Sequence, residues 1–187
     1  NSIGVVDPAD SSLAGNAIGI LVQGADNVIG GPTSASRNLI HRSATTGIFL
    51  NGAGATGNLI RFNEIRGTAT PTIPGASVGV TVVAGGSNRI LDNDIRNYGV
   101  QGVSVVSGSG NSILGNTFQL NSAGSDRAIS ISTGANGGIL PPQVLNVTPD
   151  GTILAFQIAI SAGQPSLTNA RIQVYELAPD GTLVNTP

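Results

Sequence analysis

The sequence predicts an all-β protein, a right-handed single-stranded parallel β-helix of about four to five coils followed by a partial antiparallel β-sandwich. Three observations predict this architecture: short motifs recur in a fixed order, turn-forming residues are frequent, and helical periodicity is absent. The chain of 187 residues contains 27 Gly, and 40% of its residues are hydrophobic. This composition suits many short strands joined by turns, with Ile, Val and Leu filling a long narrow core.

The first recurring motif is a small residue, a β-branched residue, any residue and an aliphatic residue. Its β-branched positions are separated by 28, 32, 23 and 26 residues. The alternation predicts a half-buried strand whose second and fourth residues point into the core and whose third residue faces solvent. The copies are Gly19-Ile20-Leu21-Val22, Gly47-Ile48-Phe49-Leu50, Gly79-Val80-Thr81-Val82, Gly102-Val103-Ser104-Val105 and Ala128-Ile129-Ser130-Ile131.

Two further motifs, each with Asn two residues before an apolar residue, follow the first motif in the same order in successive coils. The second motif occurs as Asn27-Val28-Ile29, Asn58-Leu59-Ile60, Asn88-Arg89-Ile90 and Asn111-Ser112-Ile113. The third motif occurs as Asn1-Ser2-Ile3, Asn38-Leu39-Ile40, Asn63-Glu64-Ile65, Asn93-Asp94-Ile95 and Asn116-Thr117-Phe118. Each coil is therefore predicted to contain three strands.

The recurring Asn residues are expected at the turns, because Asn tolerates left-handed backbone and its amide can bond to the Asn of the next coil. We expect such a ladder through Asn63, Asn93 and Asn116. A leucine-rich repeat also places Asn at fixed positions, but it needs a shorter period and a dominance of Leu that this chain lacks.

A change of pattern near residue 135 predicts a second unit. We expect the β-helix over residues 1–134, a linker over residues 135–142 and an incomplete immunoglobulin- or fibronectin-III-like sandwich segment over residues 143–187. Because about four strands are fewer than the seven of such a sandwich, the chain is expected to be part of a longer or polymeric protein. Exposed coil ends and the incomplete sandwich would then mediate self-association or contact neighbouring domains.

Several of these stretches carry a family resemblance. Asn27-Val28-Ile29-Gly30-Gly31-Pro32-Thr33, with Asn1-Ser2-Ile3-Gly4, Asn38-Leu39-Ile40 and Gly47-Ile48-Phe49-Leu50-Asn51, resembles the Asn-x-Ile-Gly-Gly repeats of bacterial secreted and cell-surface parallel β-helix proteins. The resemblance extends over residues 1–131, although later coils lose the double Gly. It implies the fold and an extracellular or cell-surface location, in proteins that are adhesin-like or belong to the envelope. Relatives with the same fold include carbohydrate-active enzymes.

Composition and charge exclude several classes of function. The net charge is −2, only 10% of residues are charged, and all eight basic residues are Arg, so we expect neither nucleic acid nor an anionic membrane as partner. Zero Cys excludes disulfides and thiol catalysis, and no apolar stretch reaches the length of a membrane span. The segment Gly52–Gly57 fits G-x-G-x-x-G, but a strand motif follows it where a dinucleotide site needs a helix.

β-Helix enzymes that act on acidic polysaccharides use clustered acidic residues on one face. The outward column of the first strand carries no charge here, and we predict no catalytic, cofactor-binding or metal-binding residues. That column is Leu21, Phe49, Thr81, Ser104 and Ser130.

Charged residues gather instead on the third strand, as a candidate ligand strip of His41, Glu64, Arg66, Asp92, Asp94 and Arg96. Glu64 is predicted to stack on Asp94, and His41 to share a column with Arg66 and Arg96, while Asp92 precedes the turn. The strip would bind a cation or a sugar, or would form a solvated face of compensating charges. No carboxylate is placed by the sequence to orient His41, which is expected to be a surface polar residue.

The sequence therefore favours a non-catalytic extracellular structural or adhesive protein, without cofactor. It would be a rigid β-helical rod that assembles into a polymer or forms part of a larger surface protein. Two alternatives stay open, a polysaccharide lyase or hydrolase and a carbohydrate-binding module.

Overall fold

The computed structural model describes residues 1–4, 15–67, 78–120 and 127–139, together with the backbone of four later strands. The elements are β1 (Ser2–Ile3), β2 (Ile18–Val22), β3 (Val28–Ile29), the 3₁₀ turn η1 (Ser34–Ser36), β4 (Leu39–His41), β5 (Thr46–Leu50), β6 (Leu59–Arg61), β7 (Glu64–Arg66), β8 (Val78–Val82), β9 (Arg89–Leu91), β10 (Asp94–Tyr98), β11 (Gln101–Val105), β12 (Ser112–Leu114), β13 (Thr117–Leu120), β14 (Arg127–Ile131), the 3₁₀ turn η2 (Ala135–Gly137), β15 (Gln143–Pro149), β16 (Leu154–Ala159), β17 (Tyr175–Leu177) and β18 (Thr182–Asn185).

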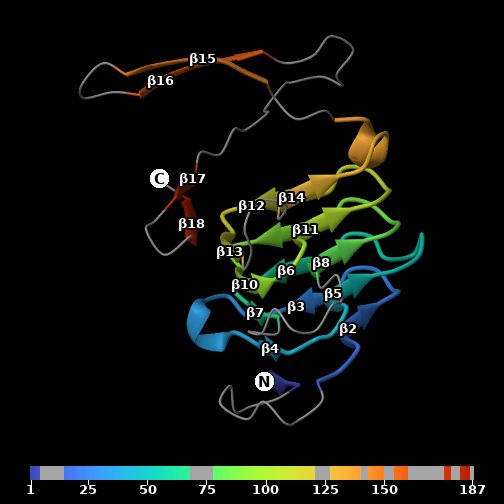
Figure 1. The fold of residues 1–187 in the computed structure, drawn as a ribbon. Helices are drawn as coiled ribbons and strands as arrows, with labels where there is room; N and C mark the ends of the chain where they lie inside the picture. The colour runs from blue at the N-terminus through green and yellow to red at the C-terminus, as the bar shows by residue number, and fades with distance from the viewer. Residues whose placement is uncertain are drawn as a thin grey trace.

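The strands stack as three parallel sheets, which confirms the predicted parallel β-helix (Figure 1). The first sheet has the order β14-β11-β8-β5-β2, the second β12-β9-β6-β3, and the third contains β1-β4-β7-β10-β13. Successive strands β2–β4, β5–β7, β8–β10 and β11–β13 make four complete coils within the described part of the chain. Equivalent motif residues are in register, as Ile48 with Val80 and Ile65 with Ile95 illustrate.

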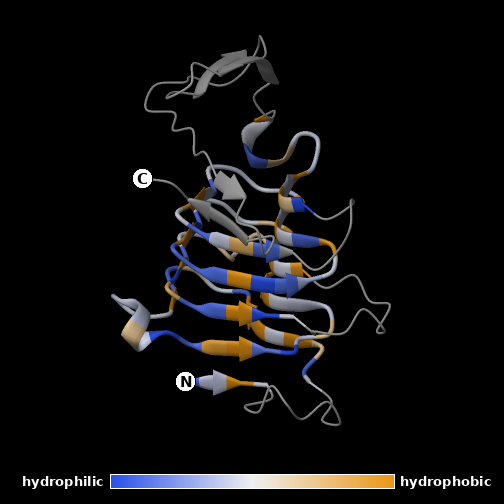
Figure 2. Ribbon diagram, turned by 60° about the vertical axis from the view of Figure 1, so that its left-hand side comes forward, coloured by the Kyte–Doolittle hydropathy of each residue, from blue (hydrophilic) through white to orange (hydrophobic). Residues whose placement is uncertain are grey.

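The core consists of aliphatic columns that run through the stack, and hydrophobic residues recur at each level (Figure 2). In the first strand the predicted alternation holds, since Ile48 and Leu50 are fully buried whereas Leu21 is 51% exposed. Thr81 and Ser104 depart from the prediction, because they belong to the expected solvent-facing column but are only 9% and 8% exposed. Each is a short side chain with an in-register neighbour on both sides, which contributes to this burial.

Two asparagine ladders run along the stack, one before the second strand and one before the third. The predicted ladder is confirmed: the Asn63 amide donates to Asn93 Oδ1 and the Asn93 amide donates to Asn116 Oδ1, each over 2.9 Å. Asn1 and Asn38 extend this ladder downward. The other ladder contains Asn27, Asn58, Asn88, Asn111 and Asn136.

The expectation that the ladder Asn residues adopt left-handed backbone is wrong for all of them except Asn136. The left-handed residue is usually the one immediately before the Asn, as at Asp26, Phe62, Ser87 and Asp92. A positive φ at that position turns the corner and leaves the following Asn amide pointing along the stack axis, where it bonds to the next coil. Seven of the ladder Asn side chains are buried, and apart from the Asn111 side-chain nitrogen the arrangement satisfies their polar atoms inside the corners. They are Asn58, Asn63, Asn88, Asn93, Asn111, Asn116 and Asn136.

A column of Gly residues explains why the first motif begins with a small residue. A Cβ atom added at Gly79 would lie 2.5 Å from Ile95 Cγ2 and 2.5 Å from the carbonyl oxygen of Gly102. The same third-strand positions would meet a Cβ at Gly19, Gly47 and Gly102. The backbone of the first strand therefore packs directly against the buried side chains of the third strand, and this contact makes the core narrow.

The structure confirms that strands follow β14, but it does not test the predicted sandwich. β15 pairs antiparallel with β16, β17 pairs antiparallel with β18, and β18 adds antiparallel to β13 at the edge of the third sheet. Ala135 and Asn136 are buried against the stack, so the first residues of the predicted linker already pack with the β-helix. The division into domains stays a prediction.

Candidate functional site

The candidate site lies on the outer face of the third sheet. The second residue of β4, β7 and β10 is an Ile that points into the core, so the residues on either side of it face outward. The parallel register stacks these outward residues in columns. It places Glu64 beside Asp94 and Arg66 beside both His41 and Arg96, as the sequence predicts.

Glu64 is the centre of a cluster of ion pairs. Its Oε1 lies 2.8 Å from Arg66 Nε and 3.3 Å from His41 Nε2, and its Oε2 lies 3.2 Å from Arg37 Nε. The Glu64 side chain is only 11% exposed, whereas those of Arg37 and Arg66 are 47% and 37% exposed. The carboxylate is thus mostly covered by the basic groups that it holds.

The contact with Glu64 corrects the expectation for His41. The His41 side chain is 12% exposed and lies against the carboxylate of the next coil, so it is neither a surface residue nor without an acidic partner. The sequence could not show this contact, because 23 residues separate the two positions and only the coil register brings them together.

A second ion pair stands one coil further along the column. Arg96 Nε lies 2.5 Å from Asp94 Oδ1, and both side chains are about one-third exposed. Asp92 lies apart from this pair, exposed at the corner before Asn93 with a φ of 53°. The structure therefore brings five of the six predicted residues onto one face and leaves Asp92 at its edge.

Arg37 belongs to the site but was missed by the sequence-based prediction. It follows η1 in a loop before β4, and nothing in the third motif marks it. From this loop its side chain reaches the carboxylate of Glu64, which lies in the next coil. A usable signal was its place directly before Asn38, the motif residue that precedes β4.

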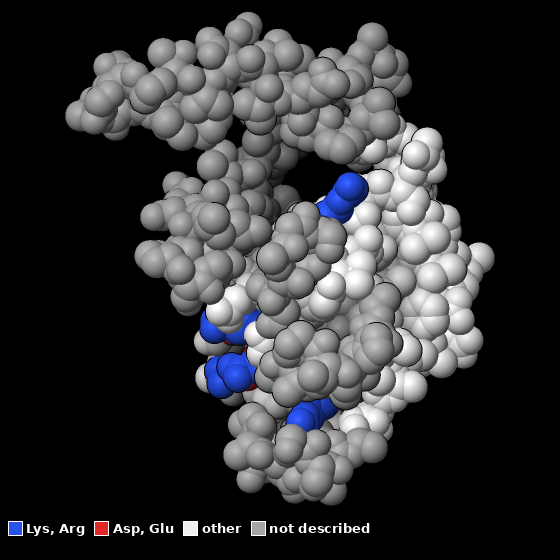
Figure 3. All heavy atoms as spheres, viewed as in Figure 1, with Lys and Arg blue, Asp and Glu red and all other residues white. Residues whose placement is uncertain are grey.

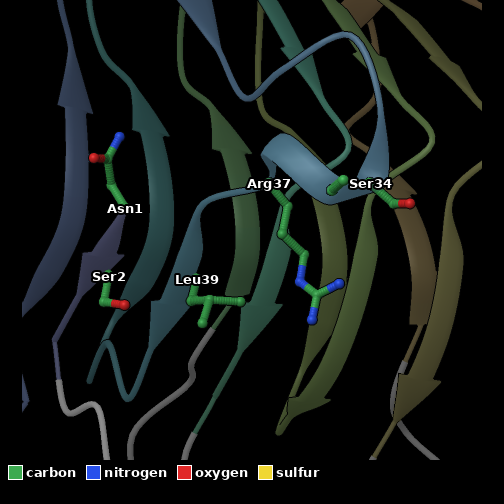
Figure 4. A pocket seen from close by; sticks show the side chains of 6 residues that line it. Asn1, Ser2, Ser34, Arg37 and Leu39 are labelled. Carbon is green, nitrogen blue, oxygen red and sulfur yellow. The ribbon is translucent and has the colours of Figure 1, made fainter.

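Arg37 also borders a hollow at the lower end of this face. The hollow has a volume of about 350 Å³ and is lined by Asn1, Ser2, Ser34, Ala35, Arg37 and Leu39. Figure 4 shows Ser2 and Leu39 on neighbouring strands, with Arg37 extending from the end of η1. Arg37 therefore belongs both to the lining of the hollow and to the Glu64 cluster.

We define the charged strip as Arg37, His41, Glu64, Arg66, Asp94 and Arg96. It contains three Arg and two carboxylates, and both carboxylates have Arg partners. On the face seen in Figure 3, Arg side chains gather beside β4, β7 and β10 and little acidic surface shows next to them. The chemistry of the charged strip suits hydrogen-bond acceptors and anions better than a cation. Among the described residues, no group of three or more His, Asp or Glu side chains is placed to hold a metal ion.

The other motifs carry no comparable cluster. Residues 52–57 form a corner of the stack, and β6 follows them directly, so the G-x-G-x-x-G segment is structural here. The outward column of the first sheet is in register as predicted and carries no charge. In the described part of the chain, no helix has the length and apolar character needed to span a membrane.

Comparison with known families agrees with this architecture. The family of the right-handed β-helix region matches residues 9–143. The chain belongs to this family. The match covers the four coils and reaches the start of β15, so it supports the right-handed winding of the stack. The family is found in extracellular structural proteins and in carbohydrate-active enzymes. No curated protein and no solved structure matches this right-handed β-helix chain in the corresponding searches.

Proposed function

We propose that this β-helix protein is a non-catalytic structural element of an extracellular or cell-surface assembly, a rigid rod that spaces or displays other parts. The observation that carries this proposal is the pair of continuous asparagine ladders. Each one links successive coils through side-chain hydrogen bonds of 2.9 Å over most of its length.

Continuity of the core supports the same function. The three aliphatic columns belong to a single buried cluster that extends from β2 to β13. Because every coil is joined to the next by three parallel ladders, by the asparagines and by the core, bending or shearing one coil disturbs many bonds together. Such repeat stacks are quasi-one-dimensional, because each coil contacts only its nearest neighbours along the axis.

The extracellular setting is supported by the resemblance of the Asn-x-Ile-Gly-Gly stretches to secreted bacterial repeat proteins. A low content of charged residues, 10%, and the complete absence of Lys also suit a protein whose surface is built from Ser, Thr, Asn and Gly. Fractionation of cells that produce the native protein, followed by surface proteolysis, tests this part.

Assembly into a polymer is the further step of this proposal. Among the described strands, β2 and β3 stand at the ends of the first and second sheets, and the edge of a sheet is a natural site for strand addition. Sedimentation velocity over a range of concentrations and electron microscopy test it. Particles that stay monomeric at every concentration contradict assembly through this chain alone.

A carbohydrate-active enzyme is the second candidate, because Glu64 and Asp94 stand on neighbouring strands of one face. A glycosidase needs one protonated acid beside one ionised carboxylate. Here each carboxylate is already engaged in an ion pair with an Arg side chain, which supports the non-catalytic proposal.

One experiment separates the two candidates. The chain is incubated with polygalacturonate, alginate and a glycosaminoglycan, and new reducing or unsaturated ends are measured. The non-catalytic proposal expects none above a boiled control. Turnover that is lost in Asp94→Asn and retained in Asp92→Asn, the matched acidic residue at the edge of the strip, overturns it.

A further inference from the structure

We propose that Asn51 is a site of spontaneous covalent modification, at which the backbone nitrogen of Gly52 attacks the side-chain amide of Asn51. Asn is followed by Gly at two places in the chain, Asn51-Gly52 and Asn136-Gly137. Gly favours this ring closure, because it has no side chain to hinder the attacking nitrogen and its backbone is the most adaptable. The structure distinguishes the two pairs. The inference goes beyond the scaffold function and does not depend on it.

The reaction needs only water and hydroxide. Hydroxide removes the proton from the Gly52 nitrogen, this nitrogen forms a bond to Asn51 Cγ, and the bond from Cγ to Nδ2 breaks as ammonia leaves. Water then opens the cyclic imide at either of its carbonyl groups. One opening gives Asp, and the other gives isoaspartate, in which the main chain runs through the former side chain.

The asparagine ladders show how the fold blocks this reaction elsewhere. The side-chain amide of Asn93 donates to Asn116 Oδ1 and to the Ile60 carbonyl. The backbone nitrogen that follows it, that of Asp94, donates to the Asn63 carbonyl. The backbone nitrogen after the Asn is bonded in the same way at most other ladder positions. Both reacting groups are therefore engaged inside the ladders.

At Asn51 neither reacting group is held. Within the described part of the chain, neither the Asn51 side chain nor the Gly52 backbone nitrogen makes a hydrogen bond. Both residues are half-buried, so water and hydroxide reach them. A Cβ added at Gly52 would meet no atom within 4 Å, so the corner leaves room for this nitrogen to approach Cγ. The local geometry therefore permits the attack.

At Asn136 the fold holds the amide that would be attacked. Asn136 Oδ1 accepts from the backbone N–H of Asn111 over 2.7 Å, and Nδ2 donates to the Asn111 carbonyl over 3.0 Å. Asn136 is also only 6% exposed. Both bonds must break before the amide can turn toward the Gly137 nitrogen, and their loss corresponds to a roughly 30-fold slower reaction. The same pair of residues thus has a different fate at the two places.

Conversion to isoaspartate would disturb a contact between coils. Asn51 directly follows β5, and its backbone N–H donates to the Val22 carbonyl over 2.8 Å. Isoaspartate lengthens the main chain by one carbon just before the corner of residues 52–57. That corner touches the next coil closely, since a Cβ added at Gly85 would lie 2.2 Å from the Ala55 carbonyl oxygen. We therefore expect the modified chain to be less stable than the unmodified one.

The test follows both pairs in the 187-residue chain during incubation at mildly alkaline pH in water enriched in heavy oxygen. Cleavage after Arg in ordinary water then places Asn51 in the peptide 43–61 and Asn136 in the peptide 128–171. Mass spectrometry with fragmentation measures the heavy oxygen that each residue incorporated before cleavage. Methyl transfer by an isoaspartate-specific methyltransferase identifies the isoaspartate product. The same incubation in guanidinium chloride gives the two rates in the unfolded chain.

We expect Asn51 to react about 10- to 30-fold faster than Asn136 in the folded chain, and the two to react at similar rates in denaturant. Asn58 is also in the peptide 43–61 and belongs to a ladder, so it should stay unmodified as an internal control. Asn51→Gln should remove the isoaspartate signal from this peptide, because its longer side chain would have to close a larger ring.

A second variant tests the protection of Asn136 directly. Ala135 is 3% exposed in η2, and Ala135→Asp places a charge at this buried position. We expect it to release η2 and to raise the rate at Asn136 while the rate at Asn51 stays unchanged. Far-UV circular dichroism shows whether each variant is folded. The comparison of the folded and unfolded parent chain stays decisive if Ala135→Asp does not fold.

Three outcomes overturn the proposal. The first is an equal rate at Asn51 and Asn136 in the folded chain, which would show that the fold does not select between them. The second is an isoaspartate signal that persists in Asn51→Gln. The third is a rate at Asn51 no higher than at Asn58. An unchanged urea midpoint after full conversion would contradict the predicted disturbance of the coil contact. None of these outcomes bears on the scaffold function, which is tested separately.

Discussion

Replacement of Asn93 by Ala tests the idea that the asparagine ladders hold the coils together. Asn93 is 1% exposed and occupies the middle of the ladder before the third strand. Its side-chain amide donates to Asn116 Oδ1 over 2.9 Å and to the Ile60 carbonyl over 3.0 Å. Its Oδ1 accepts from the backbone N–H and from the side-chain amide of Asn63. The substitution removes all four bonds.

The expected loss follows from the partners that remain. The backbone N–H of Asn63 loses its acceptor inside the corner, whereas the Asn63 amide keeps the Ile29 carbonyl and Asn116 Oδ1 keeps the Asn93 backbone N–H. At about 1 kcal/mol for each bond, the four bonds contribute about 4 kcal/mol to the free energy of unfolding. A loss of this size is a large part of the 5–15 kcal/mol typical of a folded domain.

Urea unfolding followed by far-UV circular dichroism measures this loss as a lower midpoint at an unchanged slope. The control is Asn27→Ala at the exposed lower end of the other ladder, where the amide donates to Asn58 Oδ1 and Gly24 O. There water replaces the lost contacts, and we expect a loss below about 1 kcal/mol.

Asn93→Asp adds a test of the direction of the ladder. A carboxylate can still accept from Asn63, but it cannot donate to Asn116 or Ile60, and it would place a buried charge against two oxygen atoms. We expect Asp to be at least as destabilising as Ala. An Asn93→Ala loss no larger than that of Asn27→Ala, or an Asp variant as stable as the parent chain, would refute the reasoning.

The remaining predictions concern the core. Gly79→Ala should destabilise the fold by about 1–3 kcal/mol in the same urea assay, because the added Cβ would overlap Ile95 and the Gly102 backbone. Gly24→Ala should be tolerated, because the atom nearest to its added Cβ is 3.7 Å away. Equal effects of the two substitutions would contradict the packing argument. Tyr98→Phe should raise stability by about 1 kcal/mol, because the Tyr98 hydroxyl is buried without a hydrogen-bond partner among the described residues. Burial raises the pKa of Tyr98 far above its ordinary value, so only the unfolded chain loses this proton just above about pH 10. Stability should therefore decline as pH rises above that value, and the decline should be smaller in Tyr98→Phe; an unchanged decline would show that other groups cause it.

Much of the candidate site could be predicted from the third motif. Once Ile65 and Ile95 are assigned to the core, alternation places their neighbours outside, and equal motif positions must stack. Glu64 beside Asp94 and Arg66 beside Arg96 follow from this rule. Asp92 shows the limit of this rule, because Asp92 precedes the turn and its side-chain direction depends on the left-handed backbone at that residue.

The contacts between charges required the tertiary structure. Arg37 reaches Glu64 from a loop whose conformation has no repeat to constrain it, and His41 meets Glu64 only because the two coils have a particular register. The burial of Glu64 under three basic groups is a property of their joint geometry. Neither spacing nor composition contains that information.

The sequence by itself determined the winding of this protein. Period-2 burial and a fixed order of three motifs admit few arrangements other than stacked coils, since any other would expose the aliphatic columns or bury the Asn side chains without partners. Tertiary structure decided three features that the sequence left open. It placed the left-handed corner one residue before most of the ladder Asn residues, it packed Gly47 and Gly79 against third-strand side chains, and it paired β18 with β13. The physical reason is that periodic burial is a local property repeated in every coil, whereas these features depend on distances between segments far apart in the chain.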